Sequence, residues 1–351
     1  KGSSHHPKYA TEVLKLEAGK KYPITASYFS DETNALAQVL WVKPEHNKVE
    51  EAVKITNEAD IAIVVPEISS EDYILELKKI VVKYKADAII PLNDLEFPIL
   101  LEHKKELEAL GATVFLSNEK TVNIAIDKWE SFNFFKSQGF NTPKTFLKLE
   151  NAIKSIDSNE ISFPLIIKPR WGSASMGINV VNSMEELNLA YKLQKLKRNS
   201  SIFESLNKED SEDFLLIQEF INGQEYGMDI LNDLNGDFVG AFAREKLAMR
   251  SGETDKAFTV EDKKFLKIGK ELAKTTKHIG VIDCDFFVSN NKVYILEINP
   301  RFGGGYPFTH ESGVDIPAIY ISWLLGDNDI EKHLNYNPGL TFAKYSRVME
   351  I

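Results

Sequence analysis

The chain has 351 residues, of which 43% are hydrophobic and 27% are charged, an ordinary composition for a soluble globular protein of two or three domains. Its 42 Lys and Arg against 52 Asp and Glu leave a net charge of −10, which argues against a nucleic-acid partner because nucleic acid needs a basic face. No apolar run approaches the roughly 20 residues of a membrane span, so we expect neither a membrane-spanning segment nor a signal peptide. A single cysteine, Cys284, excludes an internal disulfide framework, so we expect a cytoplasmic protein without a membrane partner.

The first third of the chain alternates short apolar runs with amphipathic stretches. Residues 69–84, for example, carry apolar side chains at helical spacing, and residues 88–92 form an apolar run that is typical of a buried strand. This alternation predicts an α/β fold with a doubly wound parallel sheet. The expected strands are 11–16, 38–42, 61–65, 88–92 and 113–116, and the expected helices are a stretch ending near 34, then 69–84 and 97–110.

The middle of the chain carries a small-residue loop between two strands. A helix is predicted over 122–139, strands over 163–168 and 178–181, and a polar helix over 184–195. Lys168 ends the first of these strands, directly before the loop. Such a loop can fold over phosphates because its backbone N–H groups are not obstructed by side chains. An ordinary flexible hairpin is the alternative, and Lys168 beside the loop argues against it.

The last third begins with strands and a run of cations. Strands are predicted over 214–220, 228–231 and 238–244, a helix over 262–278, and a closing strand over 341–351. A cation run is usually a solvated face. Here Arg244, Lys246 and Arg250 precede an acidic hairpin, so we favour a role in neutralising a triphosphate.

Two strand-forming runs, 284–288 and 292–298, form that acidic hairpin. Glu297 and Asn299 are two residues apart and project to one face. A three-residue loop, Ser289–Asn291, would place Asp285 opposite Ile295 and diagonal to Glu297. Hard oxygen ligands on one face suit Mg²⁺ or Mn²⁺ better than zinc. The alternative, a merely solvated hairpin, fits poorly because polar residues here occupy positions where strand propensity favours apolar ones.

These motifs, in this order, resemble the ATP-grasp superfamily, in particular one synthetase unit of the carbamoyl-phosphate synthetase large subunit. The resemblance covers nearly the whole chain, and the E-I-N-P-R run that ends at Arg301 is its most specific motif. It implies a preATP-grasp Rossmann-like domain over 1–120. It further implies an ATP-grasp subdomain with the lid and phosphate loop over 121–213, and a second one with the adenine strand and metal hairpin over 214–351.

The resemblance also implies a role for each motif residue. Asp285 departs from the carbamoyl-phosphate synthetase pattern, where glutamine is usual, although other family members have an acidic residue there. The implied ATP-binding residues are Lys128 and Lys168 on the phosphates, Ser173, Ala174, Ser175, Met176 and Gly177 in the lid, Glu219, Phe220 and Ile221 at the adenine, and Glu225 at the ribose. The implied metal ligands are Asp285, Glu297 and Asn299, and the candidate catalytic cations are Arg301, Arg250 and Lys246.

The implied activity is an ATP-dependent carboxylate–amine ligase that uses two Mg²⁺ or Mn²⁺ ions, forms an acyl phosphate and releases ADP and phosphate. Its substrates would be a small carboxylate and an amine, and Arg250 and Arg301 suit bidentate binding of an amino-acid carboxylate. Two alternatives stay open: phosphorylation of a small acid without ligation, and an ATP-binding protein that has lost turnover. The intact lysines, Glu297, Asn299 and Arg301 speak against the last one. Apolar helices in the first domain make a homodimer plausible.

Overall fold

The computed structural model describes residues 39–41, 63, 65–172, 177–197, 213–250 and 252–345. The chain divides into two compact units: unit 1 takes in residues 1–90, 103–114 and 344–351, and unit 2 takes in residues 91–102 and 115–343. The elements predicted over 11–16 and up to 34, and most of that over 61–65, lie outside the described residues. Within the described ranges, no helix has the length and hydrophobicity of a bilayer-spanning segment.

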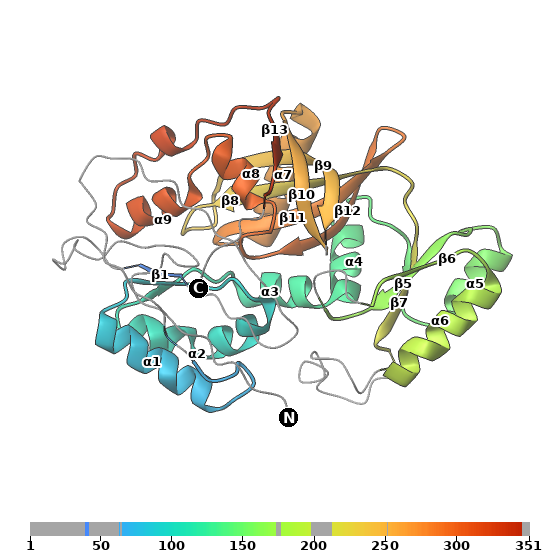
Figure 1. Cartoon of the computed structure of the whole chain (residues 1–351), viewed down its shortest axis with the longest axis horizontal. Helices are drawn as coiled ribbons and strands as arrows, with labels where there is room; N and C mark the ends of the chain where they lie inside the picture. Colours follow the sequence, from blue (N-terminus) through green and yellow to red (C-terminus); the bar gives the residue numbers. More distant parts are fainter. Residues whose placement is uncertain are drawn as a thin grey trace. The chain divides into compact units, whose positions relative to one another are not determined.

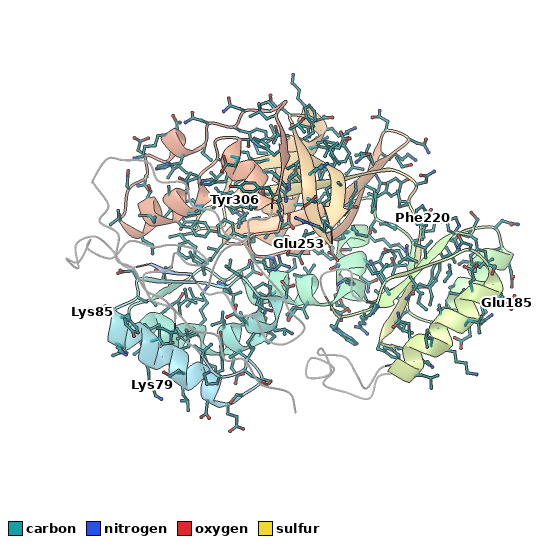
Figure 2. The ribbon with its side chains drawn as sticks, in the orientation of Figure 1. Lys79, Lys85, Glu185, Phe220, Glu253 and Tyr306 are labelled. Atoms are coloured by element: carbon teal, nitrogen blue, oxygen red, sulfur yellow. The ribbon has the colours of Figure 1, made fainter. Side chains whose placement is uncertain are left out.

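Unit 1 contains a three-stranded sheet in the order β1 (Val39–Trp41), β2 (Ala88–Ile90) and β3 (Thr113–Val114). β2 and β3 run parallel, whereas β1 runs antiparallel to β2. Helix α1 (Asp72–Tyr84) confirms the predicted amphipathic helix: it buries an apolar face, and Lys79 on its polar face projects outward (Figure 2). The helix predicted over 97–110 is confirmed as α2 (Phe97–Ala109).

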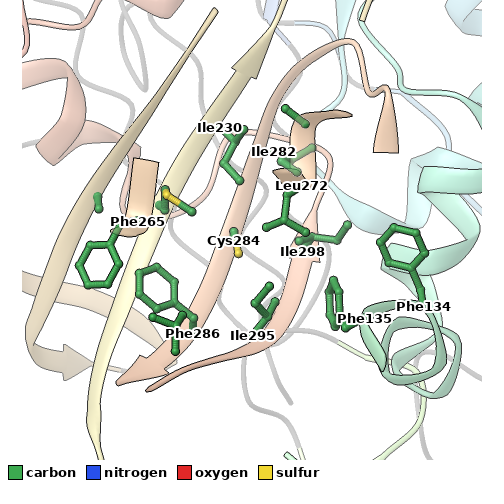
Figure 3. Packing of buried hydrophobic residues seen from close by; sticks show 14 of the residues in the cluster. Phe134, Phe135, Ile230, Phe265, Leu272, Ile282, Cys284, Phe286, Ile295 and Ile298 are labelled. Atoms are coloured by element: carbon green, nitrogen blue, oxygen red, sulfur yellow. The ribbon is translucent and has the colours of Figure 1, made fainter. Parts of the chain in front are cut away.

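A six-stranded antiparallel sheet is the main layer of unit 2 (Figure 1). Side chains alternate between its two faces, as the pleat requires. One face carries the apolar residues, and these pack against helices α4 and α7 to form the main core (Figure 3). Cys284 lies within this core and is fully buried. The strand order is β12 (Lys292–Asn299), β11 (Gly280–Ser289), β8 (Gln224–Asn232), β9 (Phe238–Arg250), β10 (Glu253–Val260) and β13 (Thr341–Ala343), and the two helices are α4 (Lys128–Ser137) and α7 (Lys263–Thr276).

A second sheet in unit 2 has four strands and its own core. Helices α5 (Leu149–Asp157) and α6 (Met184–Lys197) supply the buried side chains Ala152 and Leu187 to that core. The strand order is β4 (Thr145–Phe146), β7 (Leu215–Glu219), β5 (Leu165–Pro169) and β6 (Asn179–Val181). Among the described residues, unit 2 also contains the helices α3 (Glu119–Ile126), α8 (Tyr306–Glu311), α9 (Ile316–Leu324) and the short 3-10 helices η2 (Asp94–Glu96) and η5 (Glu331–His333).

Candidate active site

The face of the six-stranded sheet opposite the main core carries charged residues, and we call it the charged face. Met228 and Ile230 point into the core, so Asp229 between them points the other way. The same alternation holds along the neighbouring strands. The charged face consists of Glu225 and Asp229 on β8, Arg244 and Lys246 on β9, Asp283 and Asp285 on β11, and Glu297 and Asn299 on β12.

The hairpin of β11 and β12 turns in two residues, so the predicted three-residue loop is wrong. Asn290 and Asn291 form the turn with φ angles of 49° and 60°, which Asn tolerates better than most residues. A two-residue turn alone would place Asp285 opposite Leu296. A bulge at Leu296 instead shifts the register by one residue, and Asp285 pairs directly with Glu297. The two predicted ligands therefore lie side by side on the charged face.

Lys246 lies between two carboxylates of the charged face. Its Nζ is 2.8 Å from Glu225 Oε1 and 2.8 Å from Asp285 Oδ1, and its side chain is only 5% exposed. Burial raises the pKa of Asp285 to about 6; Lys246 opposes this shift, while the neighbouring carboxylates reinforce it. A bound cation would relieve this repulsion among the carboxylates.

Glu297 is the carboxylate on which the cations of the site converge. Burial by itself would raise the pKa of Glu297, but the cations around it, Lys128 foremost and Lys168 next, lower it. Lys128 Nζ lies 3.6 Å from Glu297 Oε2. Glu297 is thus held as an anion next to a carboxylate, Asp285, whose pKa is shifted the other way.

Lys128 reaches the site because the helix predicted over 122–139 is broken at Asp127, which corrects that prediction. Asp127 has an extended backbone, and its side chain caps α4 by accepting from the two backbone N–H groups at 129 and 130. Arg170 holds the same carboxylate through Nε, 2.8 Å from Oδ1, and Nη2, 2.7 Å from Oδ2. Lys128 becomes the first residue of α4, and its Nζ donates to the carbonyl of Gly172.

Lys168 is buried on β5, with 4% of its surface exposed. Its Nζ donates to Gln218 Oε1 at 2.9 Å, and Gln218 in turn donates to Thr145 Oγ1 at 2.8 Å. Desolvation lowers the pKa of Lys168 to about 8. Its ammonium group is therefore oriented by the side-chain amide of Gln218, and it could bind an anion such as a phosphate oxygen.

A buried ion-pair network that the sequence analysis did not predict lies within the charged face. Arg244, 1% exposed, places Nη1 2.5 Å from Asp229 Oδ2 and Nη2 2.7 Å from Asp283 Oδ1. Thr309 of α8 donates to Asp229 Oδ2 at 2.6 Å. Asp283 also pairs across the hairpin with Asn299, so the network anchors the strand end that carries a predicted metal ligand. The sequence feature that could have indicated this network is Asp229, a charged residue in the middle of an apolar strand run.

The glycines that follow Arg301 pack directly on this network. A methyl group at Gly303 would overlap the Asp283 carboxylate, and one at Gly305 would overlap the Arg244 guanidinium. At Gly304 the nearest atom would be a Glu253 carbon at 3.4 Å, an ordinary contact. Two of the three glycines are thus required by close packing.

Arg301 is paired with Asp94, a residue that the sequence reading did not single out. Nε lies 2.5 Å from Asp94 Oδ1, and Nη2 lies 3.0 Å from Oδ2. Asp94 also lines a small cavity with Lys128, Gly172 and Asn299. The cavity thus places Asp94 beside one predicted phosphate cation, Lys128, and one predicted metal ligand, Asn299. The charge of Arg301 also lowers the pKa of Glu297, as do those of Lys128 and Lys168.

The remaining predicted residues lie at three places. Glu219 ends β7 and accepts from the Lys144 backbone N–H at 3.1 Å; Phe220 and Ile221 follow, with Phe220 38% exposed (Figure 2). Arg250 ends β9, where its Nη2 lies 2.7 Å from Asp255 Oδ1. Gly177 precedes β6, whereas Ser173, Ala174, Ser175 and Met176 lie outside the described residues.

The donor set suits a hard divalent cation. Asp285, Glu297 and Asn299 offer two carboxylates and one amide oxygen on a single face. Among the described residues, no three His, Cys, Asp or Glu side chains cluster as a metal site. That finding agrees with a two-carboxylate set, which leaves room for phosphate oxygens and water around Mg²⁺ or Mn²⁺.

Comparison with known proteins confirms the resemblance. Residues 125–305, just over half of the chain, match the ATP-grasp domain family, and residues 16–115 match the PylC-like N-terminal domain. A carbamoyl phosphate synthase large chain from Campylobacter jejuni is 23% identical over 69% of this chain, but the match spans only 22% of that relative. A D-alanine–D-alanine ligase from Bacillus anthracis is 24% identical over 71% of this chain and 84% of its own.

Solved structures agree on the fold. The biotin carboxylase domain of the 2-oxoglutarate carboxylase of Hydrogenobacter thermophilus, 19% identical, superposes with a TM-score of 0.61 over 80% of this chain and 62% of its own. The chain therefore belongs to the ATP-grasp family, whose members use ATP and divalent metal ions.

Proposed function

We propose that this protein is an ATP-dependent carboxylate–amine ligase. It would phosphorylate a small carboxylic acid with ATP, and an amine would then attack the acyl phosphate to form an amide bond, releasing ADP and phosphate. The observation that carries the proposal is the Asp285–Glu297 pair on the charged face, with Lys128 Nζ 3.6 Å from Glu297 Oε2 and with Lys168 and Arg301 among the cations that lower the pKa of Glu297. Phosphoryl transfer needs mainly positioned cations and an in-line acceptor, so such a site suits it.

The roles of the residues follow from their positions. Lys128 and Lys168 would bind the phosphates of ATP, the backbone of Glu219–Ile221 would bind the adenine edge, and Glu225 would bind the ribose. Asp285, Glu297 and Asn299 would hold two divalent ions, which, when bound, neutralise and orient the phosphates. The ammonium group of Lys246 lies 2.8 Å from both Glu225 and Asp285, so it reduces the electrostatic repulsion between these two carboxylates.

Ligation is favoured over phosphorylation alone by the extent of the matches. The similarity to D-alanine–D-alanine ligase spans 84% of that enzyme, whereas the chain spans about a fifth of the carbamoyl phosphate synthase large chains. Arg301 has the fork geometry that binds a carboxylate or phosphoryl group through two N–H donors. We therefore propose an amino acid as at least one of the substrates.

The test is ADP release in the presence of Mg²⁺ and ATP, with pools of amino acids and small carboxylic acids as substrates. Glu297→Gln serves as the inactive blank, and Glu185→Gln, on the exposed surface of α6, is the charge-matched control. Release that requires both an acid and an amine supports the ligase. Release with an acid alone points instead to a kinase-like reaction, and ATP binding without release from any pool contradicts turnover on these substrates.

A further inference from the structure

The Asp94–Arg301 ion pair joins two segments 207 residues apart in the sequence. The carboxylate binds the side edge of the guanidinium through both oxygens, at 2.5 Å from Nε and 3.0 Å from Nη2. The two side chains are 20% and 17% exposed, so the pair is mostly shielded from water. A shielded bidentate pair fixes the plane of an Arg side chain far more strictly than a single surface contact does.

Asp94 is itself held rigidly, because it opens the 3-10 helix η2 inside a capping box. The Asn93 side chain accepts from the Leu95 N–H at 3.0 Å, and the Glu96 carboxylate accepts from the Asn93 N–H at 3.3 Å. Glu96 is fully buried. The carboxylate of Asp94 is thus presented from a capped turn.

The contacts of Arg301 leave donors for a ligand. A guanidinium has five N–H groups, of which Asp94 takes two. Nη1 donates a third to the carbonyl of Phe302 at 3.1 Å. Among the described contacts, two N–H groups remain, which is the number needed to bind one carboxylate or phosphoryl group in a bidentate manner.

We propose that Asp94 is a positioning residue, which holds the guanidinium of Arg301 in the orientation required to stabilise the group that is transferred. This inference rests on the proposed function and adds to it a residue from the segment before α2. Asp94 lines the small cavity together with Lys128 and Asn299, so the pair lies beside the phosphate and metal residues. Loss of Asp94 would leave Arg301 charged but would no longer fix the orientation of its guanidinium group.

The kinetic test compares Asp94→Ala, Asp94→Asn and Asp94→Glu. We expect Asp94→Ala to lower kcat by a factor on the order of 10 to 100, as for a misoriented catalytic group, while KM for ATP changes by less than about twofold. Asp94→Glu, which restores a carboxylate, should recover part of the loss. Asp237→Asn, which breaks an exposed pair with Lys277 at 2.9 Å, is the control and should have no effect. Unchanged or increased kcat in Asp94→Ala overturns the proposal, because Asp94 would then be idle or would compete with substrate for Arg301.

A second measurement needs no turnover, so it separates this inference from the proposed function. In protein labelled with ¹⁵N-arginine, the Nε–H signal of Arg301 is assigned by its absence in Arg301→Lys. We expect slow exchange of this proton with water in the wild type and at least about tenfold faster exchange in Asp94→Ala, because its acceptor is gone. Equal exchange rates in the two proteins refute the positioning role even if the ligase activity is found.

Discussion

Asp285 faces Glu297 across the β11–β12 hairpin because Leu296, the residue before Glu297, bulges out of the ladder. If both bind one cation, as proposed, the two carboxylates would act as one unit, although their pKa values are shifted in opposite directions. A pair of ligands that serve one ion is expected to show strongly non-additive effects.

We predict that Asp285→Asn and Glu297→Gln each abolish most of the Mg²⁺-dependent ADP release. The double variant should be no worse than the poorer single variant, because the first change already removes the shared ion. The measurement is a double-mutant cycle on kcat/KM. Glu297→Gln combined with the surface change Asp237→Asn provides the additive control, and additivity in the Asp285–Glu297 cycle would argue against a shared ion.

The glycine run after Arg301 gives a test of packing. Gly303→Ala and Gly305→Ala should each destabilise the fold by about 1 to 3 kcal/mol, because the added methyl group overlaps Asp283 or Arg244. Gly304→Ala, which adds its methyl group at 3.4 Å from Glu253, should stay within about 0.5 kcal/mol. Urea unfolding of the three variants checks this, and a Gly304 effect as large as the others would mean that chain flexibility, not overlap, sets the cost.

Lys168 predicts a pH dependence of nucleotide binding. Its pKa, lowered to about 8 by burial, means that the free protein loses the ammonium charge as the pH rises through 8. If ATP binds the charged form, the dissociation constant should rise by up to about tenfold per pH unit above 8. Calorimetric titration with ATP between pH 7 and 9.5 measures this. Lys168→Arg, which stays charged, should give a flat profile, and a flat wild-type profile would remove Lys168 from the phosphate site.

His278 predicts a pH dependence of stability. It is fully buried, and desolvation lowers its pKa to about 4, although Nε2 donates to the Ile230 carbonyl at 3.1 Å. The unfolded chain takes up this proton near pH 6.5 and the folded chain only near pH 4, so stability is lost as the pH falls through this window. The loss amounts to about 3 kcal/mol.

Unfolding free energies of the wild type and His278→Gln, measured from pH 7 to pH 4, isolate this effect from the carboxylates that titrate in the same range. The difference between the two proteins should shrink on acidification if the prediction holds. A constant difference over the window would show that His278 is protonated in the folded state as readily as in the unfolded one.

Local patterns were sufficient for much of the fold. The hairpin, the strand that contains Lys168 and helix α1 follow from alternation, turn residues and helical spacing, which are properties of neighbouring residues. The order of the motifs led to the ATP-grasp family, which the comparisons confirm. The domain limits 1–120, 121–213 and 214–351 and the roles of the individual site residues stay predictions.

The features that the sequence reading missed depend on partners distant in the chain. The helix breaks at Asp127 because Arg170, 43 residues later, binds the carboxylate that caps α4. A bulge such as that at Leu296 has no signature in a single strand, since it is defined against a partner strand. Strand β10 and helices α5, α8 and α9 were also not predicted, because their short apolar patterns do not separate helix from strand.

The buried thiol of Cys284 can be used to measure how often the main core opens to solvent. The only thiol in the chain lies in the main core on β11, one residue from Asp285, and burial raises its pKa well above the ordinary value. A thiol reagent can reach it only when the hairpin separates from α4 and α7. The rate of labelling therefore depends on how often this separation occurs. A nucleotide and ion bound by Asp285 and Glu297 would stabilise the closed hairpin. Slower labelling of Cys284 would then report their binding without an assay of the reaction.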